Sequence, residues 1–221
     1  MINKENYNKV KDRLNNKNVR LIAVSKRKPI EDILALYELG HRDFGENRVQ
    51  EMIEKAPRLP DDICWHFIGH LQSNKVKYIA PFVHMIHSVD KLKLLKEIDK
   101  QALRSGRKIK CLFQYHIADE DNKFGFLHEE VIELIASEAF AEMNNIEVVG
   151  LMGMATNTQD KPKISSEFKN LYCHFIDLKK NFIRSDNFNV ISMGMSGDFD
   201  LAIEEGSNML RVGSLIFGAR N

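Results

Sequence analysis

Short apolar runs alternate with longer stretches of helical periodicity along almost the whole chain, and this alternation restricts the fold more than any other feature. The apolar runs predict strands at residues 20–25, 41–44, 65–68, 85–89, 109–117, 148–152, 190–193 and 209–212. The stretches between them predict helices at residues 29–39, 48–55, 73–79, 91–104, 128–143, 166–182 and 199–205. Because each helix must return the chain over the sheet, the strands are expected to be parallel, which makes this an α/β protein.

Eight parallel strands can form either a closed (β/α)8 barrel or an open doubly wound sheet. No Gly-x-Gly-x-x-Gly motif follows the first strand, which weakens the dinucleotide-binding form of the open sheet. Only nine residues follow the eighth strand, and a further predicted helix at residues 4–14 would cover the gap left there. We therefore predict a single (β/α)8 TIM-type barrel over residues 1–221, with an extra N-terminal helix. The polar segment TNTQDKPKISS, residues 156–166, predicts a long surface loop.

Composition and charge argue against several classes of protein. Lys and Arg total 32 against 31 for Asp and Glu, so no net field attracts nucleic acid or anionic lipid. The N-terminal residues lack the apolar core of a signal peptide, and no apolar run has the length of a membrane span. Cys64, Cys111 and Cys173 are odd in number and widely spaced, as reduced thiols are. We expect a cytoplasmic protein that binds neither nucleic acid nor membrane.

Unusual side chains stand at the predicted C-terminal ends of the strands, which is where barrels of this kind place their sites. Lys26 comes directly after the first strand. Taken alone, it is consistent with a surface lysine just beyond a strand. A lysine at this position of a barrel can also be an amine that forms a Schiff base with an aldehyde, and the lysine alone does not decide between the two.

The loops after strands seven and eight have the composition of a phosphate site. The segment GMSGD, residues 194–198, combines two glycines, Ser196 and the start of a helix, although an ordinary turn with a helix cap has the same composition. Arg211 is followed by Gly213 and Ser214, and Arg211 taken alone fits a rim ion pair equally well. Because a barrel closes strand eight onto strand one, these groups would neighbour the lysine of strand one. Together they predict a site for a phosphorylated aldehyde.

Two pairs of histidines have spacings that raise the question of a metal site. They are His66 with His70, and His84 with His87. Both pairs lie in predicted strands or loops and lack a suitably placed carboxylate. We therefore predict no metal and assign these histidines to structural hydrogen bonding.

Seven segments taken together resemble one family, the pyridoxal phosphate homeostasis proteins, also called proline synthase co-transcribed homologs. The segments are, in order, AVSK, FGENRVQE, WHFIGHLQSNK, HSVD, GLMGMAT, SMGMSGDFDLAIEEGS and RVGSLIFGAR. The resemblance covers nearly the whole chain. It implies a single barrel similar to the N-terminal domain of alanine racemase, with pyridoxal 5'-phosphate (PLP) as the cofactor.

The resemblance also implies roles for individual residues. Lys26 matches the lysine that binds PLP as an internal aldimine, and Asn47 matches an asparagine of the cofactor site. Ser196 and the amides of residues Gly213-Ser214 match the phosphate site. Arg211 matches the arginine that faces the pyridine nitrogen. No residue is expected to be catalytic.

Four further positions bear on the resemblance. Lys28 and Lys123 match lysines implicated in secondary binding or cofactor handover. His116 stands where many relatives carry asparagine, and Asn208 stands where threonine is usual. These two departures predict altered hydrogen bonding near the site without loss of cofactor binding.

The positive charge of Arg211 would keep the pyridine nitrogen unprotonated and weaken PLP as an electron sink. Racemases of related fold take a second catalytic base from an extra β domain, which we do not expect here. The leading hypothesis is a monomeric carrier that holds PLP and delivers it to apoenzymes by transient contact, without substantial turnover. Two alternatives stay open: a PLP-dependent amino-acid racemase, and a Schiff-base aldolase-type barrel without a cofactor.

Overall fold

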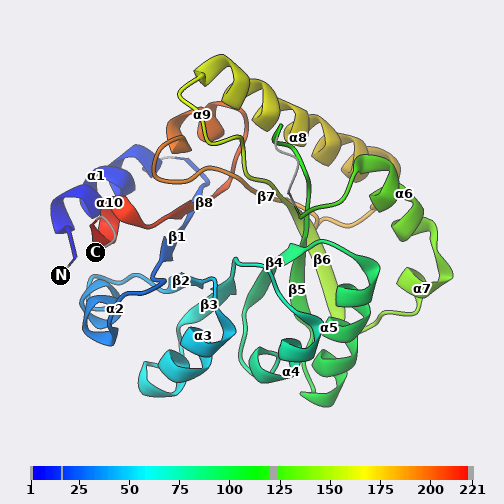
Figure 1. The fold of residues 1–221 in the computed structure, drawn as a ribbon, viewed down its shortest axis with the longest axis horizontal. Coiled ribbons are helices and arrows are strands. Elements are labelled where there is room, and N and C mark those ends of the chain that lie inside the picture. The colour runs from blue at the N-terminus through cyan, green and yellow to red at the C-terminus, as the bar shows by residue number, and fades with distance from the viewer. Residues whose placement is uncertain (1, 16, 120–123, 219–221) are drawn as a thin grey trace.

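In the computed structural model, which describes residues 2–15, 17–119 and 124–218, eight parallel strands close into a barrel inside a ring of helices (Figure 1). The strands are β1 (Arg20–Val24), β2 (Asp43–Glu46), β3 (Cys64–Phe67), β4 (Met85–Val89), β5 (Ile109–Gln114), β6 (Ile146–Met152), β7 (Val190–Ser192) and β8 (Met209–Val212). Each strand pairs with the next, and β8 closes onto β1. The predicted (β/α)8 barrel is confirmed.

Helices connect the strands on the outside of the barrel. They are α1 (Lys4–Leu14), α2 (Ile30–Tyr37), α3 (Val49–Lys55), α4 (Val76–Ile79), α5 (Leu92–Arg104), α6 (His128–Ala136), α7 (Glu138–Ala141), α8 (Lys161–Asn181), α9 (Phe199–Glu204) and α10 (Ser214–Phe217), with 3-10 turns η1 (Ala56–Arg58) and η2 (Ser73–Lys75). The N-terminal helix packs beside α10, as predicted (Figure 1). Just before α1, the amide of Asn3 donates a hydrogen bond of 2.7 Å to the carbonyl of Ile216.

Two helical predictions differ from the structure. The predicted helix at residues 128–143 is divided at Ser137, whose side chain accepts a hydrogen bond from the amide of Phe140 and so starts a second helix. The predicted surface loop at residues 156–166 is wrong in its second half. Asp160 caps the amide of Lys163 there, and α8 begins at Lys161, five residues earlier than predicted.

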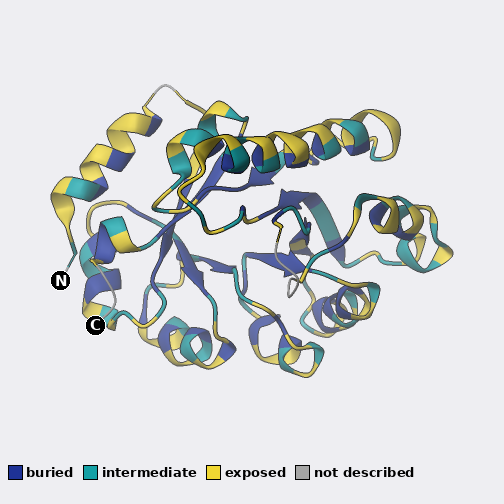
Figure 2. Cartoon of the chain, turned by 45° about the horizontal axis from the view of Figure 1, so that its top comes forward, coloured by how far each residue is buried: buried dark blue, intermediate teal, exposed yellow. Residues whose placement is uncertain are grey.

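The apolar core has two parts, and Figure 2 shows the buried strands in dark blue inside helices whose outward faces are exposed. The larger part lies between the strands and the helices. A smaller cluster fills the barrel interior, and it consists of Ile22, Met85, Leu112, Val149, Met152 and Met209. Burying a side chain of this size contributes about 1.5–3 kcal/mol to folding. Among the described residues, no helix combines the length and apolarity that crossing a bilayer requires.

Candidate functional site

The predicted site residues lie at the C-terminal ends of strands that are neighbours in the barrel. Lys26 stands two residues beyond β1, and Asn47 directly follows β2. β1 lies between β2 and β8, so the loops that follow these three strands emerge side by side. Arg211 belongs to β8 itself, and its residue is 4% exposed. The fold therefore places these predicted residues around one end of the barrel.

A direct contact joins the loops after β7 and β8. The amide of Gly213 donates a hydrogen bond of 3.3 Å to the hydroxyl of Ser196. A Cβ atom at Gly213 would lie 3.2 Å from the Cβ and carbonyl oxygen of Val24, so a glycine lets the end of β8 run close against the end of β1. Ser196, Gly213 and the segment that leads to Lys26 are thus brought together, as the closure of the barrel predicts.

In the turn that contains Ser196, one backbone N–H group already has an acceptor within the turn. The carboxylate of Asp198 accepts a hydrogen bond of 2.5 Å from the amide of Met195. Burial raises the pKa of Asp198, while this amide and the positive charge of Arg211 oppose the rise. The backbone donors of the GMSGD segment are therefore not all directed at an anion. The hydroxyl of Ser196 and the loop after β8 remain the main neutral donors.

A glycine in the loop after β3 sets the position of Asn47. A Cβ atom at Gly69 would lie only 2.2 Å from the carbonyl oxygen of Asn47, which real contacts essentially never show. The two loops pack backbone against backbone, and any larger residue at position 69 would push them apart. The loop after β3 thus supports Asn47 in the neighbouring loop after β2.

Arg211 points its guanidinium at oxygens of Ser192, in β7, and of Gly153, the first residue after β6. Nη1 donates to the carbonyl of Ser192 at 2.7 Å and to its hydroxyl at 2.6 Å, and Nη2 donates to the carbonyl of Gly153 at 2.9 Å. A guanidinium has five N–H groups, so Nε and one hydrogen of Nη2 keep no acceptor among the described residues. Burial lowers the pKa of Arg211 to about 10, against the attraction of Asp198. The side chain is still a cation at neutral pH and retains free donors.

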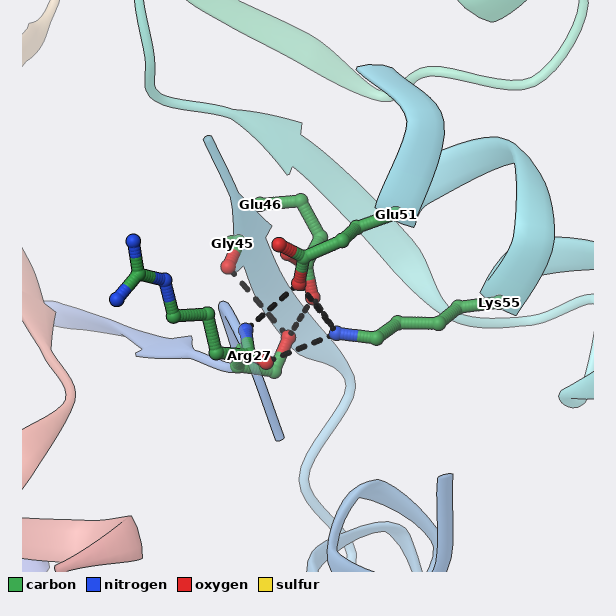
Figure 3. A network of polar contacts seen from close by, with 6 residues as sticks. Arg27, Gly45, Glu46, Glu51 and Lys55 are labelled. Carbon is green, nitrogen blue, oxygen red and sulfur yellow. Dashed lines mark hydrogen bonds and ion pairs between the residues drawn. The ribbon is translucent and has the colours of Figure 1, made fainter. Parts of the chain in front are cut away.

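A buried ion cluster fixes the backbone just before Lys26 (Figure 3). Lys55, on α3, is 8% exposed, and its ammonium donates to the carboxylates of Glu46 at 2.7 Å and Glu51 at 3.1 Å. The same ammonium donates to the carbonyl of Ser25 at 3.0 Å, and the Ser25 hydroxyl donates to Glu46 at 2.7 Å. Burial raises the pKa of Glu46, although Lys55 and Ser25 oppose the rise. The end of β1 is thereby tied to β2 and α3.

The residue after Lys26 is fixed by the same cluster. Arg27 has a φ of 60°, a left-handed conformation that costs a non-glycine residue about 1–2 kcal/mol. Its amide donates a hydrogen bond of 2.6 Å to Glu51. Burial would raise the pKa of Glu51, but this amide and Lys55 outweigh it and lower the pKa. The cluster thus fixes Ser25 and Arg27, the residues on either side of Lys26. The sequence motifs did not reveal this role of the cluster.

Lys28 and Lys123 are the two lysines considered for cofactor handover, and the structure describes only the first. The ammonium of Lys28 donates to the carbonyl of Phe217 at 2.7 Å, which attaches the start of α2 to the end of α10. This contact gives Lys28 a structural role. Lys123 lies outside the described residues.

The two departures from the family pattern lie at opposite ends of the barrel. His116 follows β5, at the same end as Lys26, and its amide donates to the carbonyl of Phe126. Asn208 precedes β8 at the other end, where its side chain accepts from the amide of Ile191 and donates to the carbonyl of Asn189. The expectation that Asn208 alters hydrogen bonding near the site is therefore wrong, because it joins the starts of β7 and β8.

Three of the four histidines have polar partners, in a pairing that the sequence spacing did not suggest. The structural hydrogen bonding expected of His84 is wrong, because its buried Nε2 has no partner among the described residues. His66 contacts His87 on the neighbouring strand, with 2.9 Å between Nδ1 and Nε2. His70 instead lies 3.3 Å from the carboxylate of Asp90. Within the described ranges, no group of three or more His, Cys, Asp or Glu side chains could hold a metal ion.

Comparison with known proteins decides the family. The family model for the N-terminal domain of alanine racemase matches residues 3–221. The pyridoxal phosphate homeostasis protein of Vibrio alginolyticus is 39% identical over 208 residues, which cover 92% of this chain and 87% of the relative. The protein of the same name from Aquifex aeolicus is 38% identical over 204 residues, or 91% of this chain and 87% of the relative. The chain belongs to the family of pyridoxal phosphate homeostasis proteins.

Solved structures of the family and of more distant proteins share the barrel. PipY of Synechococcus elongatus, solved without PLP, has a TM-score of 0.90 and 33% identity, covering 97% of this chain and 99% of PipY. The same protein with PLP bound has a TM-score of 0.88 at 32% identity, with the same coverage. Alanine racemase of Clostridium difficile 630, at 15% identity and a TM-score of 0.76, shows the common fold; the match covers 98% of this chain and 56% of the racemase.

Proposed function

We propose that this protein binds pyridoxal 5'-phosphate reversibly, with Lys26 as the covalent attachment point, and that it serves intracellular vitamin B6 homeostasis. The observation that carries the proposal is the contact between Ser196 and Gly213 beside the end of β1, two residues before Lys26. It puts candidate phosphate donors and an amine on adjoining loops. Relatives over 35% identical are named for PLP homeostasis, and PipY was solved with PLP bound, which supports the same reading.

The residues present fit this cofactor. When bound, PLP supplies an aldehyde that condenses with an amine and a pyridine ring that can accept electrons. The hydroxyl of Ser196 and the amides of Gly213 and Ser214 would hold the phosphate, and the Gly213 amide, which donates to the Ser196 hydroxyl in this structure, would turn from it to do so. Asn47 would line the site as well, on the loop after β2, which packs against the loop that contains Gly69. Arg211 would direct toward the ring nitrogen an N–H group that has no acceptor among the described residues.

We further propose that the protein is a carrier without substantial turnover. Arg211 is a cation at neutral pH, so it would donate a hydrogen bond to the ring nitrogen without giving up a proton. A ring nitrogen that stays unprotonated makes a weaker electron sink, which disfavours racemisation and transamination. Residues 1–221 would act as one monomeric domain that passes PLP to apoenzymes during transient contacts. The unpaired cysteines support a cytoplasmic location.

The attachment point is tested by borohydride reduction of PLP-loaded protein followed by peptide mapping. We expect loss of the visible absorption band and a pyridoxyl group on Lys26. Lys91 is a matched control, because it stands two residues beyond β4 as Lys26 stands beyond β1. Lys26→Ala should lose the reducible adduct, whereas Lys91→Ala should retain it. A pyridoxyl group found chiefly on another lysine, with Lys26 unmodified, contradicts the assignment.

The carrier function is tested separately from binding. Loaded protein is mixed with a PLP-dependent apoenzyme in the presence of a trap for free PLP, and we expect the apoenzyme to become active. Proton exchange at the Cα of common amino acids in deuterated buffer should stay close to that of free PLP. Rapid exchange or racemisation that Lys26→Ala abolishes would establish the racemase alternative instead.

A further inference from the structure

A series of polar side chains, buried except for Asp43 at one end, crosses the barrel interior and ends at Arg211. Nη1 of Arg211 lies 2.6 Å from the Ser192 hydroxyl, and this hydroxyl lies 3.1 Å from Nδ1 of His87. Nε2 of His87 lies 2.9 Å from Nδ1 of His66, and Nε2 of His66 lies 3.0 Å from a carboxylate oxygen of Asp43. These residues come from β8, β7, β4, β3 and β2. The proposed cofactor contacts involve only the first of them.

The direction of every hydrogen bond in this chain follows from Arg211. A guanidinium can only donate, so the hydroxyl of Ser192 accepts from it and has one hydrogen left. No other acceptor for that hydrogen exists among the described residues, so it goes to Nδ1 of His87. His87 must therefore carry its proton on Nε2 and donate to Nδ1 of His66. His66 carries its proton on Nε2 as well and donates to Asp43.

Burial agrees with these protonation states. His66 and His87 are fully buried, and burial lowers the pKa of His66 and sets the pKa of His87 well below its usual value. Both rings are therefore neutral at pH 7, and each has one donor and one acceptor. Burial tends to raise the pKa of Asp43, but its hydrogen bond from His66 and the nearby positive charges lower it overall. A cation at one end of the chain is thus connected to an anion at the other.

This arrangement constrains the cation that the cofactor would meet. The acceptors that Arg211 contacts are neutral oxygens, and the hydroxyl of Ser192 must turn a lone pair toward the guanidinium, which has only donors. The acceptor nitrogen of His87 takes up the hydroxyl hydrogen and so holds the hydroxyl in this orientation. His66 in turn fixes the tautomer of His87. Hydrogen bonds that run in one direction also polarise and strengthen one another.

We propose that His66 and His87 are positioning residues for Arg211, and that they determine which of its N–H groups remain directed at the pyridine ring. This inference rests on the proposed function, since it concerns the same arginine. The two histidines need not touch the cofactor. They act through Ser192, on the side of the guanidinium that faces away from the free donors.

The first test needs no cofactor and no variant. Nitrogen-15 NMR of the histidine rings in the protein without PLP distinguishes the two neutral tautomers and the charged form. We expect His66 and His87 to carry the proton on Nε2 at pH 7. A proton on Nδ1 of either ring, or a charged ring, would overturn the inference. Because PLP is absent, this result is independent of whether the protein binds it.

The second test reads the environment of the ring nitrogen. PLP labelled with nitrogen-15 in the pyridine ring is bound to the wild type and to variants at position 87, and its chemical shift is recorded. His87→Phe cannot accept from Ser192, and we expect a changed shift and about tenfold weaker PLP binding. His87→Asn can place an amide oxygen near the position of Nδ1, and we expect it to restore most of the wild-type signal.

His84 supplies the matched control. Its ring centroid lies 5.2 Å from that of His66, yet among the described residues no hydrogen bond joins His84 to the series of side chains that runs from Arg211 to Asp43. His84→Phe should leave the pyridine shift and the affinity unchanged. A wild-type shift and affinity in a folded His87→Phe variant would refute the positioning role. If the wild type itself binds no PLP, the proposed function fails, while the tautomers still decide the inference.

Discussion

Replacing Lys55 with methionine should destabilise the fold by about 3 kcal/mol at pH 7. The ammonium is the cation that neutralises Glu46, whose side chain is fully buried, so its loss leaves a buried carboxylate without a partner. The carboxyl group can escape this penalty by binding a proton. From the usual glutamate pKa of 4.5, neutralising it at pH 7 costs about 1.4 kcal/mol per pH unit, or about 3 kcal/mol in total. That value is the part of the loss that Glu46 causes.

The same reasoning fixes how the loss depends on pH. A carboxyl whose pKa is raised in the folded state contributes stability that is fully present below its unfolded pKa and is lost as the pH rises through the folded pKa. In Lys55→Met the pKa of Glu46 rises further, so acidification relieves the variant more than the wild type. The deficit should fall from about 3 kcal/mol at pH 7 to about 1 kcal/mol at pH 5.

Urea unfolding followed by tryptophan fluorescence measures this deficit, because the sequence has a single tryptophan, Trp65, which is 3% exposed. Groups that Lys55 does not contact titrate equally in both proteins and cancel in the difference, whereas Glu51, whose pKa Lys55 lowers, adds to the deficit, and its part also declines as acid protonates it. The double variant Lys55→Met/Glu46→Gln removes the buried charge of Glu46, so it should be more stable than Lys55→Met at pH 7 and lose the pH dependence that Glu46 causes. A deficit below 1 kcal/mol at pH 7, or one that does not shrink on acidification, would refute the argument.

Three further predictions follow from the contacts around the site and the core. Ser196→Ala should weaken PLP retention in equilibrium dialysis by about 1–2 kcal/mol, and an unchanged affinity would place the phosphate elsewhere. Gly69→Ala should cost about 2–3 kcal/mol in urea unfolding, because the new Cβ meets the carbonyl of Asn47, whereas Gly197→Ala, whose Cβ meets nothing within 4 Å, should cost far less. Burial lowers the pKa of His41 to about 4, so this histidine should contribute about 3 kcal/mol to the loss of stability as the pH drops from 6.5 to 4; His41→Gln should remove that part of the pH dependence, and an unchanged slope would count against it.

The periodicity of the sequence predicted the barrel but misplaced β2 by about two residues. Strand β2 contains Asp43 and Glu46, polar residues that weaken an apolar pattern. Both have a partner from elsewhere in the chain, Asp43 in His66 and one carboxylate oxygen of Glu46 in Lys55. A polar residue with such a partner can lie in a buried strand. Its partner is known only from the structure, which is why the strand ended too early in the prediction.

The residues of the candidate site that follow the strand ends could be predicted from the sequence. The side-chain contacts inside the barrel could not. Lys26 and Gly213 follow neighbouring strands, so the topology places them together. His87 and Ser192 are 105 positions apart, and their contact depends on which side chains of β4 and β7 point inward. Local spacing instead suggested His84 as the partner of His87. Sequence spacing cannot reveal a contact that only the closed barrel creates.

The closure of β8 onto β1 has a consequence for how the protein is made. Lys28 and Phe217, which touch in the finished fold, are 189 positions apart in the chain. Synthesis runs from the N-terminus, so the lysine of the proposed site leaves the ribosome long before the loop that would hold the phosphate. A nascent chain can present a reactive amine, yet it cannot retain the cofactor by its phosphate until the last strand is in place. Loading should therefore follow translation, and the cofactor would serve as a ligand of the completed barrel.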